Sequence, residues 1–189
     1  MENVLVPHVL IPLAQGCEEL EAVTIIDLLR RADIQVTTAG LDDKPITASR
    51  GTKLLADTTL DQIIHEEFDM VVLPGGLPGA DNLNADKRIH AMIKNTVNNG
   101  KYVAAICAAP KVLACAGLLD NKKATAYPGV LEALDNTNFS ITGTAVQKDG
   151  KILTSRGPGT AMDFTLELIA NLLGEEKRNH VEVALQRST

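Results

Sequence analysis

Met70-Val71-Val72-Leu73-Pro74-Gly75-Gly76 gives the clearest indication of the fold of this 189-residue chain. Its four apolar residues show no polar alternation, which predicts a strand buried on both faces, and the Pro-Gly-Gly that follows ends the strand. A second strand of this kind is predicted at Tyr102–Ile106. Strands buried on both faces are typical of parallel sheets with helices on either side.

Outward from these two strands, apolar runs alternate with helical patterns. Further strands are predicted at 9–14 and 34–39, with two short irregular ones in 46–56 and a hairpin of 140–146 with 152–155. Helices are predicted at 18–32, 60–66, 86–97, 110–116 and 160–173, the last with a capping box at 160–163 and a stop at Gly174, before a charged helix from Glu175. We therefore predict an α/β protein, a doubly wound sandwich with a mostly parallel central sheet, as a single domain over 1–189.

The composition excludes several classes of protein. Apolar residues make up 45% and charged residues 22%, as in a globular rather than a disordered chain. Apolar runs end well before the ~20 residues of a membrane span. Aromatic residues are only 3%, too few for a surface on which nucleic-acid bases stack. The formal net charge of −6 has the wrong sign for binding a phosphate backbone. We expect no membrane span, no sequence-specific nucleic-acid binding and, without a signal peptide pattern, a cytoplasmic location.

Three cysteines raise the question of a reactive thiol. Their spacing is not that of a metal site, and we expect neither a metal nor another cofactor. Cys107 follows a buried strand and precedes Pro110, which suits the first turn of a helix, so it occupies a sharp turn like a nucleophile elbow. Helix N–H groups there favour a thiolate, yet a cysteine at a strand end is often a small buried hydrophobe, and both interpretations stay open. Cys115 is predicted to pack in the core, and Cys17 to be partly exposed near the same sheet edge.

Glu21 is the candidate partner of Cys107. At 100° per residue it shares the apolar arc of its helix with Ile25 and Leu28, and burial of a carboxyl group raises its pKa. Glu21 is then a proton donor or shuttle, unless it merely complements the helix dipole. Gly75 and Gly76 end the neighbouring strand, where glycine lets backbone N–H groups approach a ligand, although Pro-Gly-Gly is also an ordinary turn.

Four motifs in this order resemble the ThiJ/PfpI superfamily, its DJ-one branch and most closely bacterial YajL-type proteins. The motifs are Gly16-Cys17-Glu18-Glu19-Leu20-Glu21, 69–76 around the first strand quoted, 104–110 around Cys107, and Leu153-Thr154-Ser155-Arg156-Gly157-Pro158-Gly159-Thr160. The resemblance covers essentially the whole chain. It implies a flavodoxin-like sandwich, a homodimer, a reactive Cys107 with a protonated Glu21, and oxyanion donors at the amides of Gly76 and Ala108.

The resemblance also implies a site close to the dimer interface. It assigns Gly75, Arg31, Arg50 and Pro158 to that site or interface. Tyr127 stands where the human branch carries a histidine, so a Cys–His pair is not implied. The protease-like branch has a histidine directly after its cysteine, and the alanine here argues against peptide hydrolysis.

The function that the resemblance implies is a cofactor-free glyoxalase or deglycase, protective in oxidative and carbonyl stress. Its substrates are methylglyoxal, glyoxal and their early adducts with proteins and nucleotides. The alternative is a redox sensor or a redox-activated chaperone that works through oxidation of Cys107.

Overall fold

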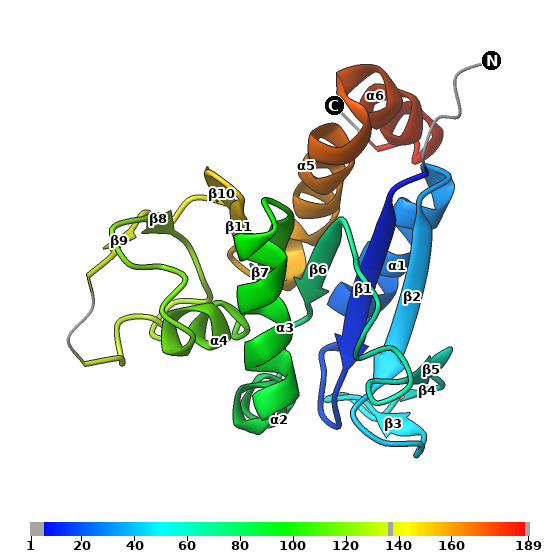
Figure 1. Cartoon of the computed structure of the whole chain (residues 1–189). Helices are drawn as coiled ribbons and strands as arrows, with labels where there is room; N and C mark the ends of the chain where they lie inside the picture. Colours follow the sequence, from blue (N-terminus) through cyan, green and yellow to red (C-terminus); the bar gives the residue numbers. More distant parts are fainter. Residues whose placement is uncertain (1–5, 136–137, 188–189) are drawn as a thin grey trace.

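Apolar strands without polar alternation do form the centre of the protein. The computed structural model describes residues 6–135 and 138–187, with a seven-stranded sheet in the order β10-β11-β7-β6-β1-β2-β5 (Figure 1). The strands are β1 (His8–Leu13), β2 (Gln35–Gly40), β5 (Thr58–Thr59), β6 (Met70–Leu73), β7 (Tyr102–Ile106), β10 (Val146–Asp149) and β11 (Ile152–Ser155). All neighbours pair parallel except the β10–β11 hairpin, which confirms the predicted sheet.

Helices cover both faces of this sheet (Figure 1). They are α1 (Glu19–Arg31), α2 (Gly79–Ala85), α3 (Lys87–Asn98), α4 (Pro110–Cys115), α5 (Ala161–Leu173) and α6 (Glu175–Ala184), with a 3₁₀ turn η1 (Pro158–Thr160) before α5. Met70 and Val72 of β6 face the core built with α1 and α5, whereas Val71 and Leu73 face the core built with α3 and α4. Each side chain of the strand is buried, which explains the missing alternation.

Two small sheets lie outside the central one. β3 (Ile46–Thr47) pairs antiparallel with β4 (Lys53–Leu54), as predicted for 46–56. β8 (Lys123–Ala124) pairs parallel with β9 (Ser140–Ile141). The predicted hairpin of 140–146 with 152–155 is therefore only partly right, because Ser140 pairs with β8 and only the segment from Val146 pairs with β11.

Local predictions fail where side chains compete with the backbone or where a helix is short. The segment 60–66 forms turns and no helix, with i→i+3 hydrogen bonds at Gln62 and Glu66, because one turn of helix is costly to nucleate. The capping box at 160–163 is wrong, since the Thr160 hydroxyl donates to Gly157 O at 2.9 Å and does not cap α5. Gly174 ends α5 with φ 88°, as predicted.

Within 6–135 and 138–187, no helix has the length and the apolar character that crossing a membrane requires. The longest helices, α1 and α5, have 13 residues each. Both pack against the central sheet and against each other.

Candidate active site

Cys107 lies in a sharp turn between β7 and α4. Its φ of 62° is in the left-handed region, which costs a non-glycine residue about 1–3 kcal/mol. Two backbone hydrogen bonds hold this conformation, because Cys107 N donates to Ser155 O at 3.0 Å and Tyr127 N donates to Cys107 O at 2.9 Å. The residue is 8% exposed, so its thiol is confined but reachable.

Glu21 enters the site from the first turn of α1. Its side chain is 0% exposed, and Oε2 accepts the N–H of Gly75 at 2.9 Å. The other oxygen, Oε1, is the one buried side-chain nitrogen or oxygen of the described residues that has no hydrogen-bond partner. A neutral carboxylic acid is the form that such a position favours, since an unpaired buried charge is costly.

Gly75 brings the acid and the thiol together at the end of β6. A Cβ atom on Gly75 would lie 2.6 Å from Cys107 Cβ, 2.7 Å from Glu21 Oε2 and 2.8 Å from Ile106 O. None of these approaches is compatible with a side chain. The glycine that the sequence left open as an ordinary turn is therefore required by packing of the site.

The two titratable groups of the site influence each other. Burial raises the pKa of Glu21 from 4.5 to about 7, against the lowering effect of hydrogen bonds with Cys107 and the Gly75 amide. Burial, followed by the charge of Glu21, raises the pKa of the Cys107 thiol to about 12. Hydrogen bonds from the amides of Gly76 and Ala108 act in the opposite direction on the thiol. Desolvation therefore outweighs the amides, and of the two interpretations left open by the sequence the raised pKa favours the protonated, buried thiol.

The pair holds one proton between these two pKa values. If Glu21 carries this proton, its negative charge beside the sulfur disappears, and the acid can donate a hydrogen bond to a thiolate. The Cys107–Glu21 pair thus offers a nucleophile and a proton donor from one shared proton. The amides of Gly76 and Ala108 add two donors directed at the same sulfur.

A pocket of about 340 Å³ opens in front of Cys107. It is lined by Glu18, Ser49, Arg50, Gly76, Leu77, Cys107, Ala108, Tyr127, Val130 and Pro158. Of these, sequence reasoning missed Glu18, Ser49, Leu77 and Val130. Glu18 had a signal, since it lies in the Gly-Cys-Glu-Glu motif and its carboxylate caps α1 by accepting Glu21 N at 2.8 Å.

Cys17 and Cys115 are placed differently from the prediction, and Arg31 lies away from the Cys107 pocket of its own chain. Arg31 lies ten residues after Glu21 on α1, roughly 15 Å along the helix axis, and pairs with Asp27 at 2.6 Å. A single chain therefore does not bring Arg31 to the pocket. Cys17 is 1% exposed instead of partly exposed, because Gly79 packs against its backbone, and burial raises its pKa to about 11. Cys115 is exposed and not in the core, since Val112 and Leu113 form the inner side of α4.

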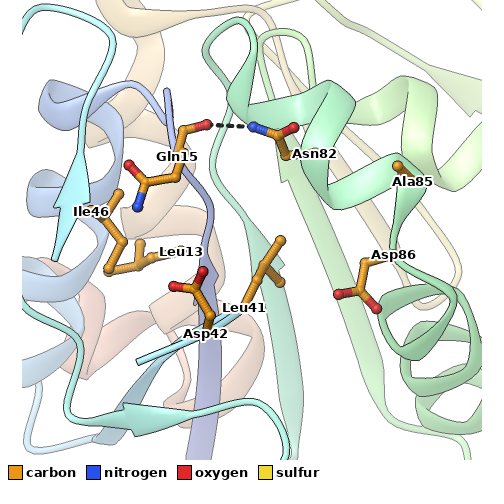
Figure 2. Close-up of a pocket in the computed structure, with 8 residues that line it drawn as sticks. All are labelled: Leu13, Gln15, Leu41, Asp42, Ile46, Asn82, Ala85 and Asp86. Carbon is orange, nitrogen blue, oxygen red and sulfur yellow. Dashed lines mark hydrogen bonds between the residues drawn. The ribbon is translucent and has the colours of Figure 1, made fainter. Parts of the chain in front are cut away.

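A second pocket of about 340 Å³ lies at the carboxyl ends of β1 and β2 (Figure 2). Its polar groups are already engaged. The Gln15 side chain donates to Pro45 O and accepts from Thr47 N. The backbone carbonyl of Gln15 accepts the Asn82 side-chain amide, as Figure 2 shows. The Asp86 carboxylate is held by Arg88 at 2.5 Å. This pocket contains no thiol, and the reactive groups lie at Cys107.

The described residues contain no group of three or more His, Cys, Asp or Glu side chains arranged to hold a metal ion. The site around Cys107 is built from one thiol, one carboxyl group and backbone amides. A thiol beside a carboxyl group is chemically suited to nucleophilic attack and proton transfer.

A comparison with models of protein families shows to which family this chain belongs. The model described as the DJ-1/PfpI family matches residues 7–171. The chain belongs to the DJ-1/PfpI family. The match confirms the resemblance drawn from the four sequence motifs, and it includes Glu21, Gly75 and Cys107.

Relatives within the DJ-1/PfpI family agree in sequence and in fold. The chain is 41% identical to protein dj-1beta of Drosophila melanogaster over 177 residues, covering 93% of this chain and 95% of the relative. The crystal structure of Drosophila melanogaster DJ-1beta superposes with a TM-score of 0.93 at 40% identity, covering 98% and 100% of the two chains. The flavodoxin-like sandwich expected from the resemblance is thereby confirmed.

Two further relatives differ from this chain in length or have a name that states an activity. Protein DJ-1 homolog A of Arabidopsis thaliana is 45% identical over 179 residues, which cover 94% of this chain but only 46% of that relative. The chain thus spans about half the length of this plant relative. A Caenorhabditis elegans relative, 31% identical over 87% of this chain and 88% of its own, is named glutathione-independent glyoxalase DJR-1.2.

Proposed function

We propose that this protein is a cysteine-dependent, cofactor-free glyoxalase that also acts as a deglycase. The observation that carries the proposal is a confined thiol that lines a pocket with Gly76 and Ala108, whose amides act on the sulfur, and that has a buried acid with a pKa of about 7 behind it. The named glyoxalase among the relatives supports it. The pocket of about 340 Å³ is ample for a two- or three-carbon aldehyde.

The proposed reaction begins with addition of Cys107 Sγ to the aldehyde carbon of methylglyoxal. The thiol proton passes through Glu21 to the aldehyde oxygen, and the product is a hemithioacetal. The amides of Gly76 and Ala108 stabilise the negative charge that develops on that oxygen. This step requires a neutral Glu21 and a Cys107 thiolate. That is the form of the pair in which Glu21 holds the shared proton.

Glu21 then transfers a proton between the two carbons. Its carboxylate removes the hydrogen of the hemithioacetal carbon to give an enediol, and returns a proton to the neighbouring carbon. The result is a lactoyl thioester on Cys107, which water hydrolyses to lactate and the free thiol. No electrons leave the substrate–enzyme system overall, because one carbon is oxidised while its neighbour is reduced. Glyoxal gives glycolate by the same steps.

Early adducts of these aldehydes with amines and thiols are substrates by the same logic. Such hemiaminals and hemithioacetals release the free aldehyde reversibly, and its capture by Cys107 draws the adduct back to the unmodified amine or thiol. The open pocket beside Arg50 and Tyr127 gives a protein-bound or nucleotide-bound adduct room to approach. A protective role in carbonyl stress follows from this activity.

The direct test measures lactate from methylglyoxal without glutathione or any added cofactor. We expect wild-type protein to form lactate of a single configuration, and chiral chromatography of the product distinguishes it from the racemic lactate of uncatalysed rearrangement. Racemic product at the background rate would contradict the proposal.

The second candidate function is redox sensing or redox-activated chaperoning through Cys107. The unpaired, buried Oε1 of Glu21 favours it, because a protonated acid there can donate a hydrogen bond to a sulfinate oxygen. A Toxoplasma gondii relative, 36% identical with a TM-score of 0.92 over 97% of this chain, has a solved structure titled as oxidized. Both functions use the same thiol.

Mild peroxide is therefore expected to add two oxygen atoms stably to Cys107. Intact mass with peptide mapping checks this, and the Glu21→Gln variant is expected to yield more of the three-oxygen product because it cannot donate the same acidic proton. The exposed Cys115 is the internal control. A disulfide or an unmodified Cys107 as the main product would count against the sensing role.

We propose that the protein is a homodimer. Leu20 and Val23 on the outer side of α1 are 52% and 46% exposed, and Arg31 falls on the same stripe of the helix at 100° per residue. Burial of this stripe against a second copy would give Arg31 a route to a site that its own chain does not provide. Light scattering is expected to give about twice the mass of 20.2 kDa, and Val23→Glu is expected to shift the mass to that of a monomer.

A further inference from the structure

The arginines of this chain divide into two groups. Five of the seven form ion pairs with carboxylates. These are Arg30, Arg31, Arg88, Arg178 and Arg187. The other two, Arg50 and Arg156, are exposed and pair with no carboxylate of residues 6–135 and 138–187. In a chain with a net charge of −6, two uncommitted guanidinium groups stand out.

The two uncommitted arginines line two adjoining hollows. Arg50 lines the Cys107 pocket, and Arg156 lines a hollow of about 290 Å³ that shares Tyr127 and Pro158 with it. Lysines without an ion pair line neither hollow. These lysines are Lys53, Lys87, Lys94, Lys123, Lys148 and Lys151. Of the two guanidinium groups without an ion pair in the described chain, one therefore lies in the Cys107 pocket and the other in the hollow that adjoins it.

The two hollows contain little negative charge. Glu18 contributes the one carboxylate among the residues that line the two hollows. Its carboxylate is turned to the start of α1, where it accepts Glu21 N at 2.8 Å. The planar fork of arginine matches the oxygens of a carboxylate or a phosphate, and among residues 6–135 and 138–187 no carboxylate pairs with Arg50 or Arg156.

We propose that the substrate taken by Cys107 is a small 2-oxoaldehyde that carries a carboxylate or a phosphate, held by Arg50 and Arg156. The chemistry at the aldehyde rests on the function proposed above: Sγ bonds to the aldehyde carbon, and the thiol proton moves to the aldehyde oxygen. The two arginines hold the anionic end of the molecule and raise its local concentration. Methylglyoxal is then the minimal substrate, which lacks the recognised group.

Alkylation with a matched pair of probes tests the anion site without any enzyme activity. Iodoacetate and iodoacetamide both transfer a carbon to sulfur with loss of iodide, and they differ in charge. We expect the ratio of the iodoacetate to the iodoacetamide rate constant to be about tenfold higher at Cys107 than at the exposed Cys115 of the same chain. The alkylation is carried out at low salt, and peptide mapping then measures the two cysteines separately.

The double variant Arg50→Gln/Arg156→Gln is expected to bring the ratio at Cys107 to within about twofold of that at Cys115. The control Lys148→Gln/Lys151→Gln removes the same charge from exposed lysines outside both hollows, and we expect it to retain the wild-type ratio. Equal ratios at the two cysteines of wild-type protein would overturn the proposal. Equal losses in the two double variants would also overturn it.

Turnover then identifies the anionic group. The three substrates are methylglyoxal, 4,5-dioxopentanoate with a carboxylate, and 3-phosphooxy-2-oxopropanal with a phosphate. We expect kcat/KM for at least one anionic compound to exceed that for methylglyoxal about tenfold, and this preference to vanish in the arginine double variant. If methylglyoxal is turned over but neither anionic compound is preferred, the anion site is refuted and the proposed glyoxalase stands. A raised alkylation ratio without turnover of any of the three supports the anion site and refutes the proposed glyoxalase.

Discussion

Replacing Cys107 with serine is expected to lower lactate formation from methylglyoxal at least about a thousandfold. The serine hydroxyl is a much weaker nucleophile than a thiol that can give its proton to Glu21. The same left-handed turn and the same backbone hydrogen bonds hold the replaced side chain, so the variant isolates the sulfur. Initial rates of lactate formation at several substrate concentrations give kcat and KM separately.

Cys115→Ser is the matched control for this prediction. Cys115 is exposed on α4, eight residues after Cys107, and lines no part of the site. We expect its kcat/KM to stay within about twofold of wild type. Thermal unfolding of both variants shows whether the fold is kept. Unchanged turnover in a folded Cys107→Ser protein would rule out the covalent mechanism.

Replacing Glu21 with glutamine is expected to lower kcat about a hundredfold or more. The amide fills the same buried space but can neither accept the thiol proton nor return one to the second carbon. Hydrogen bonding to the Gly75 amide can persist through the glutamine oxygen, so folding is retained. The reduction is expected mainly in kcat, since Glu21 acts on the bound hemithioacetal.

The pH dependence distinguishes a proton carrier from a structural residue. Below pH 7 Glu21 and Cys107 both hold protons, and above it the pair holds the single shared proton of the reactive form. The rate of wild-type protein is thus expected to rise through about pH 7. The glutamine variant is expected to lose this limb, because only the raised pKa of the thiol remains. A rate profile that keeps its inflection near pH 7 would contradict the assignment.

The pH dependence of the folding stability also tests the pKa of Glu21. The folded pKa of about 7 lies above the ordinary value of 4.5, so the contribution of Glu21 is fully present below pH 4.5 and is lost as pH rises through 7. The shift corresponds to about 3 kcal/mol. We expect the stability of Glu21→Gln to lack this decline, whereas Glu176→Gln on the exposed start of α6 retains it.

Sequence patterns predicted the central sheet well because burial on both faces leaves a plain signature. Val71 and Val72 point to opposite cores, and both must be apolar. The same patterns missed α2, which has only seven residues and begins after Pro78 without a side-chain cap. They also assigned a helix to 60–66, where Leu60 and Ile63 are buried at helical spacing but are held by turns. Spacing alone does not reveal which hydrogen bonds a short segment makes.

The site was predictable where chemistry and position coincide. Cys107 and Glu21 follow from a strand-to-helix turn and from a carboxyl group on an apolar arc. Cys115 was misplaced because α4 is too short for its outer side to be distinguished from the sequence. The sequence could not decide the direction of the Cys107 pKa, because desolvation depends on the surrounding core and not on neighbours in the chain.

The missing side chain of Gly75 has a consequence for comparing sequences. An added methyl group would meet atoms of Cys107, Glu21 and Ile106 at once, so moving a single neighbour would not relieve the crowding. The spacing between acid and sulfur is consequently set by main-chain geometry instead of by rotamer choice. In a homologue, any residue other than glycine at this position signals that the pair has been separated, even where both the cysteine and the glutamate are retained. One position can thus be used to sort family members with an intact pair from those that have adapted the scaffold to other tasks.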